Sequence, residues 1–357
     1  MKNIKRTSVS DDLTSLHAQD PAHVGRLIHQ WFLQYGRELP WRDTYDAYHI
    51  WLAEIILQQT RIQQGIKYYY RFLERFPNIH SLAEAELDEV LKYWEGLGYY
   101  SRARNLHATA QYVSRELSGE FPTHYLELLK LKGVGPYTAR AIGSFAFGNQ
   151  TGVIDGNVLR VMSRVLGDHS PINEVSTRNA FQKIIDTWVA DVPSRAFNHG
   201  IMDIGATICT PSQPGCMICP LTSTCVGRAQ NLTHILPYKP KKLKRKIRFY
   251  QFYLCKNAAG EIAIRKRPER GLWGGLWEIP QTEIDRDLWL TKKDDLGGRY
   301  VGELKHVFTH FDMMIHVYHI DEDSFDTEGF QFISTDKISI FAFPKAILTI
   351  FDLFLFL

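Results

Sequence analysis

The pattern of apolar and polar positions changes character near residue 237 of the 357-residue chain. Before that point, apolar residues recur with the spacing of helices, and after it they form short runs separated by turn residues. We expect helices near 21–35, 63–76, 87–94, 156–166, 177–189 and 194–208. Strands are expected over 248–255, 261–267, 300–308 and 313–320, with a turn at 257–260. The sequence therefore predicts a helical region followed by an α+β region.

The length of the chain suits two domains, each large enough to bury its own core. We expect a flexible polar tail over 1–20, a helical domain over 21–228, a linker over 229–247 and a second domain over 248–357. The linker holds the basic run PYKPKKLKRKIR, which is more simply a solvated segment than a phosphate contact. The apolar C-terminal stretch is interrupted by Pro344, Lys345 and Asp352, so it predicts a packed helix instead of a membrane span.

Composition narrows the class of protein without identifying it. Hydrophobic residues make up 45% and charged residues 23%, as in ordinary soluble globular proteins. The net charge of +3 is too small to indicate a nucleic-acid partner, so any basic surface must be local. The N-terminus lacks an apolar signal segment, and four of the five cysteines crowd between 209 and 225. This cysteine usage indicates a metal site in a reducing compartment, and we expect a cytoplasmic protein, nucleoid-associated if bacterial.

Glu54 is unusual because it lies inside an apolar helix. Asp46 can cap a helix whose members are apolar on nearly every side: Ile50, Trp51, Leu52, Ile55, Ile56 and Leu57. Such a helix is buried, and a carboxyl group that is removed from water has a raised pKa. From the spacing alone, the alternative that Glu54 lies at one hydrated edge of the helix is equally open.

A second notable stretch, LKGVGPYTARAIGSFAFGNQTGVIDGNV, begins at Leu131 and predicts two helices joined by a GVG turn. Gly133 and Gly135 leave the backbone accessible, and Pro136 occupies the first position of the following helix. The free N–H groups at that helix start can bind a phosphate without reading a base. The simpler interpretation is an ordinary interhelical turn. Asp155 also has two interpretations, a catalytic carboxylate or the N-cap of the helix over 156–166.

The four crowded cysteines form the pattern C-x6-C-x2-C-x5-C through Cys209, Cys216, Cys219 and Cys225. Structural zinc sites usually combine two close pairs of ligands, whereas only one pair is close in this segment. Four thiolates in so compact a loop fit a [4Fe–4S] cluster, with zinc as the alternative. Cys255 lies on an expected strand and is most simply a packed thiol.

Taken together, LKGVGPYTA and VIDGNVLRV resemble the helix–hairpin–helix and the catalytic aspartate of the DNA glycosylases related to endonuclease III. WLAEIILQQT is similar to the segment that carries the catalytic glutamate of adenine DNA glycosylases of the MutY type, and GLWGGLWEIP resembles their Nudix-like C-terminal domain. The resemblance extends over residues 24–350. It implies a multidomain fold: an all-α helix–hairpin–helix glycosylase domain with an iron–sulfur cluster loop at 209–225, followed by an α+β Nudix-like domain.

The activity that this resemblance implies is base excision repair by a monofunctional glycosylase. The enzyme would hydrolyse the N-glycosidic bond of adenine mispaired with 8-oxoguanine or guanine and leave an abasic site. Glu54 would protonate N7 of adenine, Asp155 would stabilise the oxocarbenium ion, and Tyr137 would orient Asp155 and the nucleophile. The segment after Trp277 has no match to the Glu-rich helix of a working Nudix hydrolase, so we expect the second domain to recognise and not to hydrolyse.

The resemblance also assigns residues that contact DNA. Trp41 and Arg42 would line the adenine pocket, and Gln59 would enter the gap that the extruded base leaves. Leu97 and Tyr99 would lie against the opposite base, although without the family Tyr99 would pass for a core aromatic residue. The other expected contacts are Thr60, Gly133, Gly135 and Asn157, and the loop that reads 8-oxoguanine is Phe308, Thr309 and His310, with Thr309 in place of the family's serine.

The implied cofactor is one [4Fe–4S] cluster, held in a structural role, and the implied partner is double-stranded DNA with A:8-oxoguanine or A:G mispairs. The protein is expected to act as a monomer away from membranes. The TPSQPG segment after Cys209 lacks the Lys or Arg that relatives often carry. A bifunctional lyase of the endonuclease III type and a catalytically silent iron–sulfur DNA-binding protein are the alternatives. Tyr137 disfavours the lyase, which uses a lysine at that place.

Overall fold

The computed structural model describes residues 20–240, 245–291 and 298–356. They pack into two compact units. The first contains the described residues of Met1–Ile66 and Arg115–Lys241, and the second those of Lys67–Ser114 and Lys242–Leu357. Residues 67–114 therefore pack with the C-terminal part of the chain, although their sequence pattern groups them with the helical region. The expected tail, apart from Asp20, and the 241–244 part of the expected linker lie outside the described residues.

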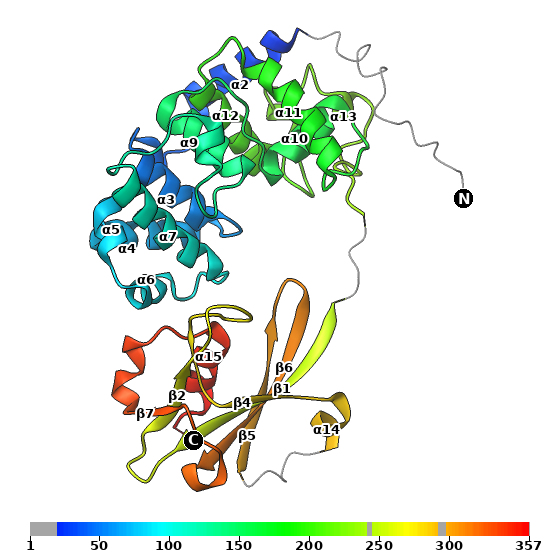
Figure 1. Cartoon of the computed structure of the whole chain (residues 1–357). Helices are drawn as coiled ribbons and strands as arrows, with labels where there is room; N and C mark the ends of the chain where they lie inside the picture. Colours follow the sequence, from blue (N-terminus) through cyan, green and yellow to red (C-terminus); the bar gives the residue numbers. More distant parts are fainter. Residues whose placement is uncertain (1–19, 241–244, 292–297, 357) are drawn as a thin grey trace. The chain divides into compact units, whose positions relative to one another are not determined.

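The first unit is helical, as the sequence predicts (Figure 1). Its helices are α2 (Pro21–Tyr35), α3 (Ala47–Leu57), α8 (Tyr125–Leu128), α9 (Pro136–Phe147), α10 (Gly156–Leu166), α11 (Val175–Val189), α12 (Ser194–Asp203) and α13 (Val226–Ala229). Short 3-10 turns occur at Pro40–Arg42 and Cys216–Ile218. The helix expected over 194–208 is α12 continued by a π-helical turn at Ile204–Ile208. A further helix, α4 (Ile62–Arg75), crosses from the first unit into the second.

Aspartates begin three of these helices. Asp20 accepts a hydrogen bond from Ala22 N at the start of α2. At the start of α3, Asp46 accepts from Tyr48 N and His49 N, and Asp155 accepts from Val158 N at the start of α10. Each such cap stabilises its helix by about 1 kcal/mol. The first residues of these three helices are therefore defined by short-range hydrogen bonds that the sequence already specifies.

The core of the first unit forms where α2, α10, α11 and α12 meet. Its buried members include Ile28, Val161, Met162, Phe181, Phe197 and Ile201. Helix α3 packs against α9, and Ile50 of α3 joins Ala141, Phe145 and Val153 in a smaller buried cluster. This packing brings the middle of α3, where Glu54 lies, next to the start of α9.

The second unit combines α5 (Ile79–Glu84), α6 (Leu87–Trp94) and most of α7 (Ser101–Glu116) with a seven-stranded sheet. The strands are β1 (Lys246–Lys256), β2 (Ile262–Lys266), β3 (Trp277–Glu278), β4 (Gln281–Ile284), β5 (Arg299–Val307), β6 (Phe311–Asp321) and β7 (Gln331–Ile333). Their order is β3-β2-β1-β6-β5, with β4 beside β1 and β7 beside β2. Strands β1 and β6 run parallel, from Lys246 opposite Phe311 to Lys256 opposite Asp321 (Figure 1).

The apolar C-terminal stretch forms the packed helix α15 (Lys345–Phe354), which confirms the prediction of a buried terminal helix. Its Ile347 and Ile350 are fully buried in the same core as Phe252 and Ile315 of the sheet. Between β4 and β5, the described residues form one short helix, α14 (Arg286–Thr291). Within the described part of the chain, no helix combines the length and the apolar character needed to cross a membrane.

Candidate active site

Glu54 is buried at the middle of α3, with 7% of its surface exposed. Its Oε2 accepts a hydrogen bond of 2.8 Å from the hydroxyl of Tyr137 on α9. Burial raises the pKa of Glu54 to about 7, and the Tyr137 bond opposes that shift because it favours the ionised form. The alternative of a hydrated helix edge is therefore wrong: the carboxyl group is removed from water and changes its charge near neutral pH.

Asp155 is both a helix cap and part of this polar site. Its Oδ1 accepts from Val158 N at 2.7 Å, and its Oδ2 accepts from Asn157 Nδ2 at 2.9 Å. Burial raises the pKa of Asp155, while these two donors and the charge of Arg160 oppose the increase. The charge of Asp155 in turn raises the pKa of Glu54, so the two carboxyl groups are electrostatically coupled. The two interpretations of Asp155, cap and site residue, are compatible in one structure.

Tyr137 has a different partner from the one we expected. We predicted that it orients Asp155, but its hydroxyl donates to Glu54. The reason is the packing of α9 on α3, which places the second residue of α9 beside the middle of α3. Burial raises the pKa of Tyr137 well above its usual value, and the nearby Glu54 and Asp155 charges raise it further. The phenol therefore stays protonated and acts as a hydrogen-bond donor.

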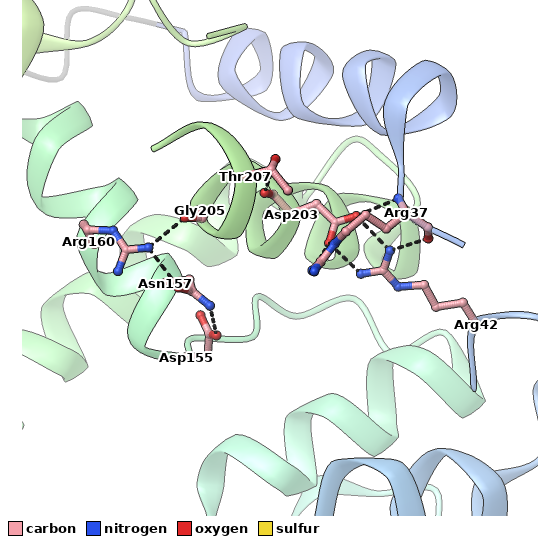
Figure 2. A network of polar contacts seen from close by, with 8 residues as sticks. All are labelled: Arg37, Arg42, Asp155, Asn157, Arg160, Asp203, Gly205 and Thr207. Atoms are coloured by element: carbon pink, nitrogen blue, oxygen red, sulfur yellow. Dashed lines mark hydrogen bonds and ion pairs between the residues drawn. The ribbon is translucent and has the colours of Figure 1, made fainter. Parts of the chain in front are cut away.

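Asp155 is connected to the cysteine loop by side chains on one face of α10. Asn157 donates to Asp155, and Arg160 Nη2 donates to Asn157 Oδ1 at 2.8 Å and to Gly205 O at 2.7 Å (Figure 2). Arg160 Nε also donates to Cys209 O at 2.8 Å. A continuous series of hydrogen bonds thus joins the carboxylate to the first cysteine of the loop. Sequence reasoning missed Arg160, although its spacing from Asn157 on the same helix face could have indicated it.

Arg42 lies in a buried ion-pair network. Its Nη1 and Nη2 donate to the two carboxylate oxygens of Asp203 at 2.8 and 2.9 Å, and Arg37 pairs with the same carboxylate (Figure 2). The side chains of Arg42 and Asp203 are 8% and 0% exposed. This network fixes the buried Trp41–Arg42 turn to the end of α12. The role of Trp41 and Arg42 in an adenine pocket stays a prediction, and Asp203 was not predicted.

Gln59, Thr60, Gly133 and Gly135, which are expected DNA-contact residues of the first unit, lie on turns, and Gln59 and Gly133 are exposed. Gln59 follows α3, is exposed and has a φ of 59°, a left-handed conformation that is rare for a residue with a side chain. Thr60 follows it directly and donates its N–H to Leu57 O. In the hairpin, Gly133 has a φ of 77°, whereas Gly135 is extended and has open space around it where a side chain would be. The turn before α9 is thus accessible, as the predicted binding of a DNA phosphate requires.

The second unit brings the predicted opposite-base residues to one cavity. This cavity, of about 720 Å³, is lined by Leu97, Tyr99, Phe308, Thr309 and His310, together with Arg104, Arg248, Trp273 and Lys345. Tyr99 is 44% exposed and has a φ of 47°. The ring of Phe308 stacks on Phe311 at 4.4 Å and lies 5.7 Å from Trp273, so the core of the unit supports the loop. Trp273 was not predicted as part of this cavity.

The four cysteines of the loop also line one cavity. They share it with Arg164 and apolar residues that include Val161, Ile208 and Leu221. Arg164 is 1% exposed, and its Nη1 lies 3.3 Å from Cys209 Sγ while it also donates to Thr210 O. A buried guanidinium in the lining of a cavity that four thiols share suits a site that holds negative charge. The donor set therefore fits an anionic iron–sulfur cluster, and Arg164 is a second residue of α10 that sequence reasoning missed.

Comparisons with known proteins agree with this geometry. Residues 52–187 match the HhH-GPD superfamily of base excision DNA repair proteins, and residues 251–353 match the NUDIX domain. An adenine DNA glycosylase of Buchnera aphidicola subsp. Baizongia pistaciae is 36% identical over 293 residues, which cover 81% of this chain and 83% of that protein. The adenine DNA glycosylase of Homo sapiens is 34% identical over 373 residues, which cover 84% of this chain and 67% of that protein.

Among solved structures, one described as a thermostable thymine-DNA glycosylase is similar, with a TM-score of 0.55 and 29% identity. The similarity covers 59% of this chain and 97% of that one. The fold and the matched families define a helix–hairpin–helix base excision repair protein with a NUDIX-type second domain. Within that class, the chain belongs to the adenine DNA glycosylases of the MutY type.

The buried Glu54 predicts a pH-dependent gain of stability in Glu54→Gln. The folded pKa of about 7 lies above the ordinary value of 4.5, so the folded state resists ionisation. Below pH 4.5 the carboxyl is neutral in both states, and above pH 7 its ionisation costs the folded state about 3 kcal/mol. Denaturant unfolding from pH 5 to pH 8 should show the variant gaining stability relative to the wild type as the pH rises. A difference that does not change with pH would contradict the burial of an ionisable group.

Proposed function

We propose that this adenine DNA glycosylase removes adenine opposite 8-oxoguanine or guanine by acid-assisted hydrolysis, and that it leaves an intact strand with an abasic site. The observation that carries the proposal is the buried Glu54, whose pKa is raised to about 7 and whose carboxyl group is held by the Tyr137 hydroxyl. A general acid works best when its pKa lies near the working pH. At neutral pH a large fraction of Glu54 is therefore ready to donate a proton.

The chemistry needs that proton because adenine is a poor leaving group from deoxyribose. Glu54 gives its proton to N7 of adenine as the C1′–N9 bond breaks, and the positive charge that develops on the sugar is stabilised by ionised Asp155. Water then adds to C1′, and its proton returns to the Glu54 carboxylate. The two donors on Asp155, Val158 N and Asn157 Nδ2, favour the ionised form that this role requires.

The adenine must leave the helical stack before it reaches Glu54. Extrusion costs roughly a few kcal/mol, so the protein must hold the distorted duplex open. The accessible turn at Gly133 and Gly135 grips the phosphate backbone through the free N–H groups at the start of α9. Gln59, which is exposed on its left-handed turn, fills the gap that the adenine leaves. The protein acts on double-stranded DNA as a monomer.

Glu54→Gln tests the acid directly. The amide keeps the shape and can still accept the Tyr137 hydrogen bond, but it has no acidic proton, so adenine release should fall by roughly 10²-fold or more. Binding to the A:8-oxoguanine duplex should stay close to the wild-type value. Single-turnover release and duplex binding are compared with Glu116→Gln, an exposed glutamate in the same unit. Release near the wild-type rate would make Glu54 a structural residue and overturn the mechanism.

Tyr137 predicts that the enzyme does not cut the DNA strand. A lyase needs an amine that attacks C1′ and forms a Schiff base, and a phenol cannot form one. Strand breaks should therefore appear only after alkali treatment, and borohydride should trap no more protein–DNA adduct than a reaction with Glu54→Gln does. Efficient trapping by the wild type would contradict a hydrolytic mechanism. Tyr137→Lys is the complementary variant, and it should gain adduct formation if position 137 faces the sugar.

The base opposite adenine is read at the cavity of the second unit. Thr309 and His310 are exposed at its edge, and Phe308 is supported by Phe311 and Trp273. Side-chain hydrogen bonds to a base edge provide discrimination, whereas the aromatic ring of Phe308 provides a stacking surface. Preference for 8-oxoguanine over guanine thus depends on this loop, while excision depends on the first unit.

His310→Ala should lower the preference for 8-oxoguanine over guanine by about 10-fold, since one good base contact is worth about 1–3 kcal/mol. The single-turnover rate should fall with the A:8-oxoguanine duplex and should change little with the A:G duplex. Because His310 is exposed, its removal leaves the core intact. His234→Ala removes another exposed histidine and serves as the control. An unchanged preference would move the reading of the opposite base away from this loop.

The four cysteines hold one [4Fe–4S] cluster. Their shared cavity, the neighbouring Arg164 and the apolar lining support a cluster whose role is structural. When bound, such a cluster cross-links the loop between Cys209 and Cys225. The loop is tied by hydrogen bonds to Arg164 and Arg160 on α10. Loss of the cluster therefore loosens the contacts that extend to Asp155.

The cluster proposal predicts about four irons and four sulfides per chain, with little zinc. Protein prepared without oxygen should absorb visible light as iron–sulfur proteins do. Metal analysis of the wild type is compared with Cys219→Ser and with Cys255→Ser, because Cys255 is a buried thiol on β1 outside the loop. Only Cys219→Ser should lose iron. Stoichiometric zinc in a colourless wild-type preparation would contradict the cluster.

A further inference from the structure

Within the second unit, the end of α6 binds the extended segment Phe341–Phe343, which precedes α15. Lys92 Nζ donates to Phe341 O at 2.9 Å, and Phe343 N donates to Glu95 Oε1 at 2.9 Å. The two side chains also pair with each other, with 2.7 Å between Lys92 Nζ and Glu95 Oε2. We call Lys92 and Glu95 the clasp. Both charges are largely sheltered, with side chains 28% and 17% exposed.

The clasp lies directly before the turn that carries Tyr99. Gly96, Gly98 and Tyr99 have φ values of 92°, 70° and 47°, so this turn is left-handed at three positions. Such a conformation is unfavourable for tyrosine, and it persists only where the surroundings fix it. Tyr68 OH donates to Glu95 O at 2.7 Å, which fixes the first peptide of the turn. Glu95 therefore connects the backbone of the Tyr99 turn to the Phe341–Phe343 segment.

The Phe341–Phe343 segment is also bound to the sheet, against whose core Phe308 packs. Trp277 N donates to Ala342 O at 2.9 Å, so β3 also holds the segment. In the lining of the cavity, Arg104 on α7 donates to Gly274 O, next to Trp273, whose ring packs on Phe308. Tyr100 OH also donates to Phe343 O at 3.3 Å, so several contacts connect the elements around the cavity that the Tyr99 turn and the Phe308–His310 loop share.

By contrast, the ion pair between Lys266 and Asp88 in this unit is exposed on both sides, at 45% and 47%. Exposed pairs of this kind contribute little to the stability of an arrangement. The clasp differs because its charged groups bind backbone atoms in a sheltered position, where charge-assisted hydrogen bonds are strong and directional. The clasp is therefore better suited than this exposed ion pair to fix the width of the cavity.

We propose that Glu95, with Lys92, is a positioning residue for opposite-base specificity. It sets the distance between Tyr99 and the Phe308–His310 loop. Tyr99 can then insert into the base stack of the DNA directly beside the base that the loop contacts. Glu95 contacts neither the adenine nor the opposite base. This inference rests on the proposed reading of 8-oxoguanine at the same cavity, and it assigns a residue outside the site residues predicted from the sequence.

The test measures single-turnover excision with A:8-oxoguanine and A:G duplexes in Glu95→Ala, His310→Ala and the double variant. Glu95→Ala should lower the preference for 8-oxoguanine about 10-fold, mainly through A:8-oxoguanine. The double variant should lose little more than either single variant, because both changes interrupt one recognition step. Glu89→Ala is the matched control, since Glu89 lies on the same helix and pairs with Arg75 instead of the segment. Its preference should equal that of the wild type.

Glu95→Gln keeps an oxygen that can accept from Phe343 N but loses the charge, and it should retain part of the preference. It also provides the test if Glu95→Ala does not fold. The proposal would be overturned if the loss of preference in the double variant equalled the product of the two single losses. It would also be overturned if Glu95→Ala slowed excision equally with both duplexes. If His310→Ala leaves the preference unchanged, the proposed reading of the opposite base fails. If His310→Ala lowers the preference and both Glu95 variants leave it intact, only the clasp fails.

Discussion

The burial of one carboxyl group in an apolar helix is the constraint on which the rest of the site depends. Glu54 does not ionise at its ordinary pKa, because it and the neighbouring residues of α3 are buried away from water. The hydrogen bond from Tyr137 satisfies one oxygen and limits the increase in the pKa of Glu54. The fold therefore carries a proton donor at neutral pH at the expense of some stability. Sites that hold ionisable groups in this way are commonly the sites of chemistry.

Asp155 is linked by hydrogen bonds to residues that lie far from it in the sequence. The aspartate caps α10, and α10 also carries Asn157, Arg160 and Arg164 toward the cysteine loop. A loop far along the chain is thereby connected to this carboxylate through Asn157 and Arg160. By the same principle, we propose that Glu95 in the second unit acts through the backbone of the Tyr99 turn. In both units, the proposed positioning residues lie behind the groups that we propose to contact DNA.

The helices with strong local signals were predictable from sequence, and α2, α6 and α10 begin and end where expected. Strands β3, β4 and β7 were missed because they are two to four residues long, and pairing with longer neighbours defines them. Glu54, Asp155 and the cysteines stand out because their residue types contrast with their surroundings. The Asp203 network and the partner of Tyr137 were not predictable, since both depend on packing between helices distant in the sequence.

The most direct test of the account is the pH dependence of single-turnover adenine excision in the wild type and in Tyr137→Phe. If protonated Glu54 is the acid, the rate should fall tenfold per pH unit above a value near 7. The Tyr137 hydrogen bond lowers the pKa of Glu54, so its removal should move the fall to higher pH. A rate that is independent of pH from 6 to 9, or a fall at the same pH in both proteins, would contradict the central role of Glu54.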